Sequence, residues 1–284
     1  MHEIAFFDET LDINSTLSYH ISIQASLNGF SFCILDTVRN KYIGLKHIQI
    51  TNDTTKDTIH SKSDEIIKND ELLNQNFKSV SFIYSSQKST LVPSSLFIKE
   101  NLKSFFCFNH TIDVNDIIYF NKLKNADAYN IFAIPKYLVS SFSKKFPNIK
   151  FHHQATPFIE NILIKNKHSG NKKTVFINVQ KWFFDIVVIN SKNLSLYNSF
   201  HFKNEKDFIF FIMYIYEKIN LNPEENEIIF SGEIDNNSKY FEIVKKFIRH
   251  IKFEKLNDSF SYSYTFNDIS PHTFVNLINL YRCE

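Results

Sequence analysis

The sequence predicts an α/β protein made of two copies of one unit, in which a mixed β-sheet is flanked by helices. The first observation is a repeated pattern, because residues 144–151 read KKFPNIKF and residues 245–253 read KKFIRHIKF. The second observation is that each copy is followed by a hydroxyl-bearing residue and a proline, Thr156-Pro157 and Ser270-Pro271. Such a pair is typical of a helix start. An internal repeat of this kind constrains the fold before any single residue does.

The order of the expected elements is the third observation. Each copy opens with three apolar, partly alternating segments, at 20–25, 30–35 and 42–50 and again at 174–179, 183–189 and 194–202. Runs of Val, Ile, Phe and Tyr bounded by Asn, Ser and Asp predict strands, and the short polar gaps between them predict hairpins. Each copy is therefore expected to begin with a three-stranded meander.

Further strands and helices are expected after each meander. The strands lie at 80–84, 131–134 and 227–230, and the helices at 63–75, 136–146, 207–219 and 238–250. The helix at 207–219 is almost wholly apolar, which is typical of a helix buried between neighbours. Its apolar run, 208–216, is too short to span a bilayer.

Two domains are predicted, one over residues 1–168 with an insertion around 85–124, and one over residues 169–284. The chain has 284 residues, of which 43% are hydrophobic, and this is enough for two cores. The first ten residues carry no positively charged leader region, so the cytoplasm is the expected location.

Several classes of site are disfavoured by composition. Cys33, Cys107 and Cys283 form no CxxC pair, which argues against a disulfide framework and a zinc site. His152 and His153 are neighbours on an expected strand, so they point to opposite faces and do not chelate one ion together. A net charge of +2 with both signs interspersed gives no basic stripe for nucleic acid.

The small number and wide spacing of the glycines exclude the glycine-rich phosphate-binding motifs. The chain has four, and the closest two, Gly29 and Gly44, are 15 positions apart, so GxGxxG, Walker A and GxSxG motifs do not occur. Such loops need glycine because backbone N–H groups approach the anion through φ/ψ values that a Cβ forbids.

The element order β-β-β-α-β-α-β-α, found twice, resembles the actin-like ATPase fold, the duplicated ribonuclease H-like architecture of actin and sugar kinases. The resemblance covers the chain from about Leu17 onward and implies a mixed five-stranded sheet with flanking helices in each half. In that family an Asp and a glycine-rich turn in each first hairpin bind Mg-bound phosphates. Here the aspartate positions are Gln24 and Asn178, and the second turn reads Gln180-Lys181-Trp182.

Two other segments resemble the chaperone-type members of the family. Phe184-Asp185-Ile186 is similar to their Phe-Asp-Val after the turn, and Ser231-Gly232 is similar to their adenosine-contacting Thr-Gly-Gly. Gly232 is interpreted in two ways, as a strand-to-helix turn that requires glycine or as an adenosine contact. The exchange of aspartate for amide removes the charge that holds Mg²⁺, because an amide is a neutral, weaker ligand for a hard cation. The resemblance therefore implies a degenerate nucleotide site with no bound cofactor.

A closer similarity is to an uncharacterised Bacteroidetes family, number 3822 among the domains of unknown function. It rests on short motifs in three places: Ser22-Ile23 with Gly29-Phe30-Ser31-Phe32, Leu91-Val92-Pro93 before Leu96-Phe97, and the final Leu280-Tyr281-Arg282-Cys283-Glu284. No activity follows from this resemblance, since a fold alone does not give a function.

The leading hypothesis is a non-catalytic actin-like protein that acts by binding another protein, as a scaffold or adaptor. The alternative is an ATP-binding switch with lost or altered hydrolysis, in which Lys181 meets a phosphate directly and Gly232 contacts adenosine. A ribonuclease H-type nuclease is disfavoured because Gln24 stands where that class needs a metal-binding carboxylate.

Overall fold

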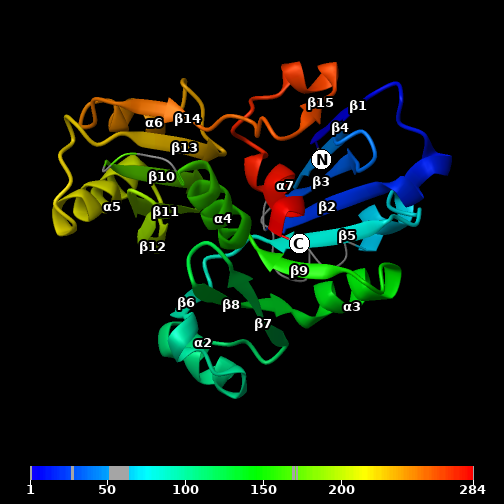
Figure 1. Ribbon diagram of the computed structural model, residues 1–284, viewed down its shortest axis with the longest axis horizontal. Coiled ribbons are helices and arrows are strands. Elements are labelled where there is room, and N and C mark those ends of the chain that lie inside the picture. The colour runs from blue at the N-terminus through cyan, green and yellow to red at the C-terminus, as the bar shows by residue number, and fades with distance from the viewer. Residues whose placement is uncertain (1, 27–28, 51–63, 168–169, 171, 284) are drawn as a thin grey trace.

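The protein is described by a computed structural model over residues 2–26, 29–50, 64–167, 170 and 172–283. These residues form a seven-stranded, a five-stranded and a three-stranded sheet with helices packed on them. The two larger sheets lie side by side, and the smallest sheet lies beneath the junction between them in the view of Figure 1. Among the helices of the described residues, none combines the length and hydropathy needed to cross a membrane.

The first large sheet has the strand order β1-β4-β3-β2-β5-β9, and β15 also pairs with β4. Strands β2, β3 and β4 form the predicted antiparallel meander, and β5 and β9 continue the sheet parallel to β2. The prediction of five strands is wrong for this sheet, because strands from both ends of the chain pair with the free edge of β4. The strands are β1 His2–Phe7, β2 Tyr19–Ser26, β3 Gly29–Asp36, β4 Lys41–Gln49, β5 Ser79–Tyr84, β9 Lys150–His153 and β15 Ser261–Tyr262.

The second large sheet has five strands in the order β12-β11-β10-β13-β14, as predicted. Strands β10, β11 and β12 are antiparallel, and β13 and β14 add parallel to β10. Five strands of the first sheet follow the same pattern; that the two halves arose by duplication stays a prediction. The strands are β10 Lys173–Val179, β11 Phe183–Asn190, β12 Asn193–His201, β13 Ile228–Gly232 and β14 Ile251–Phe253.

The three-stranded sheet is an insertion that is larger than predicted. Its order is β6-β8-β7, and β8 includes residues 131–134, which were expected to belong to the first large sheet. That expectation is wrong because β9 takes the place beside β5. We call residues 89–135 the insertion; it contains β6 Ser89–Pro93, the short helices η2 Ser94–Leu96 and η3 Lys99–Asn101, α2 Leu102–Asn109, β7 Asp116–Leu123 and β8 Ala128–Pro135.

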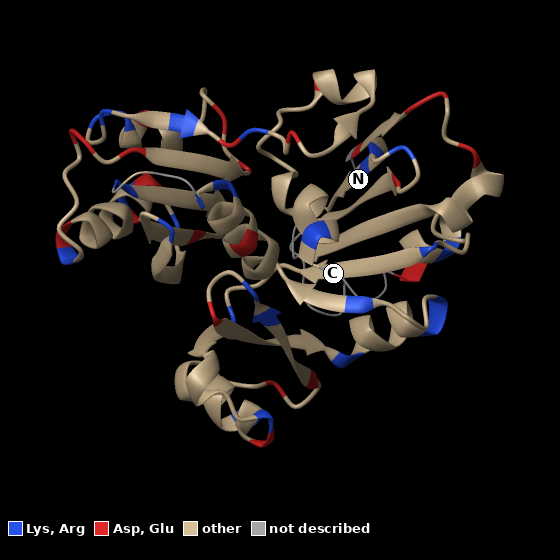
Figure 2. Ribbon diagram, in the orientation of Figure 1, with Lys and Arg blue, Asp and Glu red and all other residues tan. Residues whose placement is uncertain are grey.

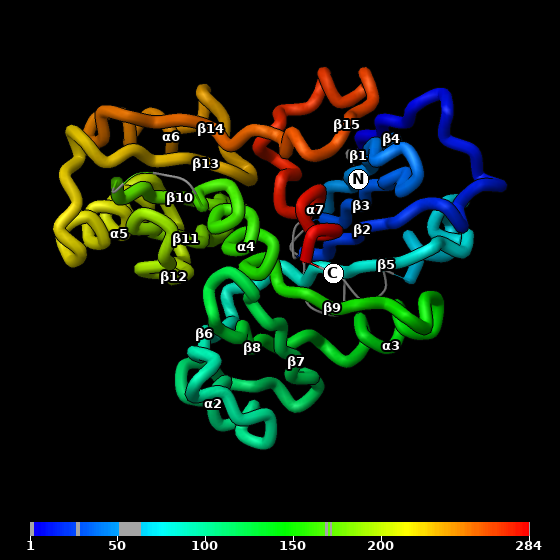
Figure 3. The backbone as a smooth tube through the Cα atoms, in the orientation of Figure 1, coloured from blue at the N-terminus to red at the C-terminus, as the bar shows by residue number. Residues whose placement is uncertain are grey.

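Two helices join the halves by packing against the sheet of the other half. Helix α4 (Ala155–Lys165) follows β9 and packs through Phe158 and Ile162 on the second large sheet. Helix α7 (Val275–Asn279), near the C-terminus, packs through Leu277 and Ile278 on the first, and Figure 3 shows this red segment lying over the blue strands. The predicted division at residues 168 and 169 stays a prediction, and packing crosses it in both directions.

The other faces of the large sheets carry the remaining helices, whose bounds differ in part from the predicted ones. Helix α3 (Lys136–Lys145) packs on the first sheet together with the helical residues 64–69. This helical segment ends at residue 69, before the predicted end at 75, and the predicted first residue, 63, lies outside the described part. Helices α5 (Glu205–Lys218) and α6 (Lys239–Val244) pack on the second. The predicted 238–250 helix ends early, because residues 245–250 form turns and irregular structure. The chain also has the 3₁₀ helices η1 Ile13–Ser18, η4 Tyr264–Asp268 and η5 Leu280–Cys283.

Helix α5 is not buried on all sides, which corrects the sequence-based expectation. It buries Phe208, Ile212 and Ile215 against the second sheet, but Phe210 is 62% exposed and Tyr214 42% exposed. Helix α5 packs one side on the second sheet. Its opposite side is exposed, and this side also carries apolar side chains.

Neither Thr156-Pro157 nor Ser270-Pro271 forms the N-cap of a helix. Helix α4 begins before the pair, with Gln154 at its N-cap position, and the Thr156 hydroxyl donates to Oδ1 of Asn121 at 2.9 Å. Helix α7 begins after Ser270-Pro271, with Phe274 at its N-cap position. The predicted helix starts were wrong because proline is tolerated throughout the first turn of a helix and in turns that precede a helix. A Thr-Pro or Ser-Pro pair therefore does not determine which residue is the first of the helix.

Candidate functional site

The residues predicted from the resemblance lie at the junction of the two large sheets. Gln24 lies near the end of β2, Asn178 near the end of β10, Lys181 in the β10–β11 turn and Gly232 at the end of β13. Asn178 is 1% exposed, and its Oδ1 accepts a hydrogen bond from the Ser231 hydroxyl at 3.3 Å. Lys181 is exposed, and its Nζ lies 5.3 Å from the centre of the Trp182 ring. The structure thus brings Asn178 and Gly232 together and leaves Lys181 at the surface.

Gly232 is required by the packing of its own backbone. Its φ is +86°, in the region that L side chains rarely adopt. A Cβ at this position would lie 2.1 Å from the carbonyl oxygen of Val179, which accepts a hydrogen bond from Glu233 N at 2.8 Å. This geometry fits the interpretation of Gly232 as a strand-to-helix turn.

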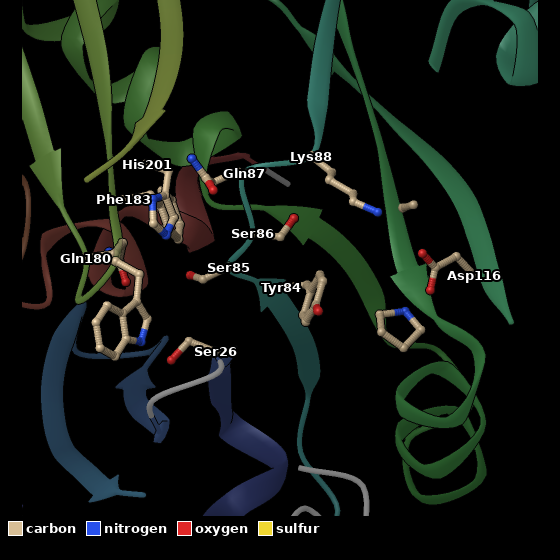
Figure 4. A pocket seen from close by; sticks show the side chains of 13 residues that line it. Ser26, Tyr84, Ser85, Ser86, Gln87, Lys88, Asp116, Gln180, Phe183 and His201 are labelled. Atoms are coloured by element: carbon tan, nitrogen blue, oxygen red, sulfur yellow. The ribbon is translucent and has the colours of Figure 1, made fainter. Parts of the chain in front are cut away.

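One cavity of about 330 Å³ opens between the insertion and the two large sheets, and we call it the insertion-side cavity. Its aromatic walls come from Tyr84, Trp182 and Phe183. Its neutral polar groups are the hydroxyls of Ser26 and Ser85 with the amides of Gln87 and Gln180, and Figure 4 shows these side chains around one space. Lys88, Asp116 and His201 also line it.

A second cavity of about 400 Å³ lies toward the C-terminal segment, and we call it the C-terminal-side cavity. Gln24, Glu233 and Phe274 line it, and it shares Ser26 and Gln180 with the insertion-side cavity. The two cavities are therefore neighbouring parts of one cleft. Lys181 lines neither of them.

The cleft lies where ligands commonly bind in α/β proteins. Ser26 ends β2, Ser85 follows β5 and Gln180 follows β10, so the cleft is at the carboxyl ends of three strands that belong to the parallel parts of two sheets. Crevices outside the carboxyl ends of parallel strands are the usual ligand sites of open α/β sheets. The topology therefore favours a binding role for this cleft.

A buried polar cluster holds the three parts of the chain together beside the cleft. Asp185 is fully buried on β11 and accepts hydrogen bonds from Gln154 Nε2 at 3.1 Å and from the Tyr197 hydroxyl at 3.2 Å. Gln154 also donates to the carbonyl of Ser86 at 2.6 Å, and the Tyr197 hydroxyl lies 3.2 Å from the hydroxyl of Ser89. The cluster thus joins the second sheet to the loop after β5 and to the insertion.

Burial shifts the protonation of two groups in this region. Burial raises the pKa of Asp185 to about 6, against the hydrogen bonds that favour its charged form. Burial lowers the pKa of His153 to about 3, so its ring is neutral at physiological pH. Its Nε2 lies 2.9 Å from the carbonyl of Ser86, and its Nδ1 accepts from the Ala155 N–H at 3.2 Å. His153 is thus held by the backbone, which fits a structural role.

The charge of the site is mixed and weak. Figure 2 shows acidic and basic residues interspersed along the ribbon of all three sheets. Within the described ranges, no group of three or more His, Cys, Asp or Glu is placed to hold a metal ion. Gln24 and Asn178 present neutral amides, which are weak ligands for Mg²⁺. The cleft offers aromatic rings and neutral hydrogen-bonding groups.

Sequence reasoning did not identify Tyr84, Ser85, Gln154 or Tyr197 as site residues. Tyr84 ends an expected strand and Ser85 follows it, and β5 joins its neighbours only through long-range pairing. The available signal for Gln154 was its position two residues before Thr156-Pro157, where the two halves join.

Comparison with known proteins gives the fold and the family. A protein with actin-like ATPase fold and unknown function from Bacteroides thetaiotaomicron VPI-5482 superposes with a TM-score of 0.84 at 25% identity, over 97% of this chain and 100% of the other. A chain of the PilM-PilN type IV pilus biogenesis complex superposes with a TM-score of 0.62 at 8% identity, over 93% and 98% of the two chains. A search of the curated proteins found no match.

These similarities establish the actin-like ATPase fold predicted from the sequence, with mixed sheets and flanking helices. The sequence also matches the family described as "Protein of unknown function (DUF3822)" over residues 8–251. Since this match spans most of the 284 residues, the chain belongs to that family.

Proposed function

We propose that this protein is a non-catalytic member of the actin-like fold that acts in the cytoplasm by binding another protein, as a scaffold or adaptor. The observation that carries the proposal is the lining of the cleft. Where the fold's ATPases place phosphate-binding turns, Gln180 and Trp182 project side chains into the space, and Asn178 is engaged with Ser231. Aromatic rings and neutral groups are typical of protein recognition and poorly suited to a phosphate chain with Mg²⁺.

Exposed apolar side chains on the insertion support the same role. Leu96 is 63% exposed, Ile98 51% and Phe108 88%. Large apolar side chains gathered on one small subdomain are typical of a binding surface. The similar PilM chain comes from a PilM-PilN complex, so one protein of this fold has been captured with a protein partner.

Affinity capture tests this proposal. The tagged protein is compared with a Leu96→Asp/Phe108→Asp double variant, which places two charges on the insertion surface while leaving buried contacts intact. We expect a specific partner to be recovered with the wild type and lost with the double variant. The matched control is Val38→Asp, because Val38 is 79% exposed in the β3–β4 turn of the first sheet. Equal recovery from the double variant would contradict a partner site on the insertion.

Point variants are preferable to deletion of the predicted insertion, residues 85–124. That deletion would remove both β6 and β7 and leave β8 without its two partners in the sheet. It would also remove Ser86 and Ser89, which contact the buried polar cluster. Loss of a partner after such a deletion would reflect a damaged core.

The alternative proposal is an ATP-binding switch with lost or altered hydrolysis. It is favoured by Lys181, an exposed cation in the turn where this fold binds phosphates. Its ammonium contacts the Trp182 ring, a weak interaction of about 0.5–1 kcal/mol that a phosphate could displace. Nucleotide binding separates the two proposals.

A further inference from the structure

The insertion-side cavity is large enough to hold a large side chain. Its volume is about 330 Å³, whereas pockets for drug-sized ligands cover about 300–1,000 Å³. The cavity therefore lies at the lower end of that range, and it is large enough for one aromatic ring and its attachment. Its mouth is at the surface, since Trp182 is 49% exposed and His201 is also exposed.

A buried hydroxyl in the cavity wall has no hydrogen-bond partner among the described residues. Ser85 is 3% exposed and lines the cavity, and its Oγ makes no hydrogen bond to any residue that the structure describes. Figure 4 shows this hydroxyl beside Tyr84 and directed toward the side of the cavity where Gln180 lies. A buried polar atom without a partner is costly, so a group that enters the cavity with a hydrogen-bonding atom would recover that cost.

The chemistry of the walls defines the occupant. The rings of Tyr84, Trp182 and Phe183 offer flat apolar surfaces, which favour stacked or edge-to-face contact with another ring. Ser85 and Gln180 provide neutral hydrogen-bonding groups. Lys88 and Asp116 carry opposite charges, so the lining does not select an ion of either sign.

From these observations we infer that the insertion-side cavity receives an aromatic side chain of the protein partner, which serves as the anchor of the interface. The inference rests on the proposed function and names the chemistry of its partner. An aromatic residue in a well-packed pocket is the usual form of an interface hot spot. The ring enters among Tyr84, Trp182 and Phe183, while the partner's backbone remains near His201 and Gln87 at the surface.

Trp182 provides a direct readout, because it is the only tryptophan of the chain and lines the cavity. The probe is N-acetyl-L-phenylalaninamide, an uncharged peptide unit that does not absorb at the wavelength used to excite tryptophan. We expect a saturable change in Trp182 fluorescence with a dissociation constant on the order of 1 mM, as small ligands of this size permit. N-acetyl-L-alaninamide, with the same backbone and no ring, should give no saturable change.

Two further ligands separate the alternatives. Saturation by adenosine without saturation by N-acetyl-L-phenylalaninamide would overturn the inference in favour of a free heteroaromatic metabolite. Saturation by neither would overturn it altogether. Equal binding of N-acetyl-L-leucinamide would overturn the preference for a ring.

The Ser85 hydroxyl is tested by Ser85→Ala. The variant loses a hydroxyl that makes no hydrogen bond to any described residue, so we expect unchanged folding and about fivefold weaker binding of N-acetyl-L-tyrosinamide, whose ring hydroxyl can bond to Ser85. Binding of N-acetyl-L-phenylalaninamide, whose ring has no hydrogen-bonding atom, should be unchanged. Ser94→Ala is the matched control, because the Ser94 hydroxyl is also buried without a partner among the described residues but lies outside the cavity. Equal binding of N-acetyl-L-tyrosinamide by wild type and Ser85→Ala would show that this hydroxyl does not contact the occupant.

The outcomes distinguish this inference from the proposed function. If the wild-type protein captures no partner, the scaffold proposal fails whatever the fragment titrations give. If a partner is captured and N-acetyl-L-phenylalaninamide at 10 mM does not reduce its recovery, the scaffold proposal stands and the anchor inference is overturned. We expect reduced recovery with this probe and unchanged recovery with N-acetyl-L-alaninamide.

Discussion

The carboxylate of Asp185 accepts a hydrogen bond from Gln154 Nε2 at 3.1 Å, and both residues are almost completely buried. Asp185 lies in the second sheet, whereas Gln154 follows β9 of the first sheet and leads into α4. This one contact therefore connects the two halves of the molecule at the cleft. Because this contact involves an ionisable carboxyl group, we expect the stability of the connection between the halves to depend on pH.

The pH dependence of stability follows from the pKa of Asp185, which burial raises from 3.8 to about 6. Because the folded protein holds this proton more tightly than the unfolded chain, Asp185 contributes stability below pH 4 that is lost as the pH rises to 6. The full effect is on the order of 3 kcal/mol. We expect Asp185→Asn to be more stable than wild type at pH 7, with the difference shrinking toward pH 4, in urea unfolding at several pH values. A constant difference across that range would contradict the raised pKa.

Tyr197 attaches the insertion to the second sheet. Its hydroxyl donates to Oδ1 of Asp185 and lies 3.2 Å from the Ser89 hydroxyl at the start of β6. We expect Tyr197→Phe to lower the free energy of unfolding by about 1–2 kcal/mol, because a buried carboxylate loses a donor. Limited proteolysis should then cut the insertion sooner than in the wild type. Unchanged protease resistance and stability would show that this hydroxyl does not hold the insertion.

Gly232 should not tolerate a side chain. Gly232→Ala places a Cβ against the carbonyl of Val179 at a positive φ, so we expect a loss of about 2–4 kcal/mol in chemical denaturation. Gly170→Ala is the matched control, because a Cβ there meets no atom of the described residues within 4 Å. It should change stability by no more than about 0.5 kcal/mol. Similar effects of the two substitutions would contradict a packing role for Gly232.

The fold could be predicted because its strands carry local signals. Apolar and polar residues alternate in part in segments 20–25 and 174–179, because successive side chains of a strand point to opposite faces of its sheet. Both segments are strands close to the expected bounds. Strands β1 and β15 were missed because they gain their stability from pairing with β4, far away in the sequence. A pairing partner of this kind leaves little trace in a short window of residues.

The candidate site was predictable in part. Of the positions that the resemblance indicated, Gln24 lines the C-terminal-side cavity, whereas Asn178, Lys181 and Gly232 line neither cavity. The resemblance did not locate Ser85 or Tyr197, since their roles come from the insertion that packs against the second sheet. The contribution of an insertion to a cleft depends on its docking, which no local pattern encodes.

Nucleotide binding is the prediction that separates the two proposed functions. The neutral amides of Gln24 and Asn178 and the ring of Trp182 disfavour a Mg-bound phosphate chain, so we expect no change in melting temperature with millimolar Mg-ATP or Mg-ADP. A ligand at a hundred times its dissociation constant adds about 2.7 kcal/mol. For a protein of this size, that would raise the melting temperature by on the order of 5 °C. A rise of that size, present with Mg-ATP, absent with Mg²⁺ alone and reduced by Lys181→Ala, would replace the scaffold proposal with the ATP-binding switch.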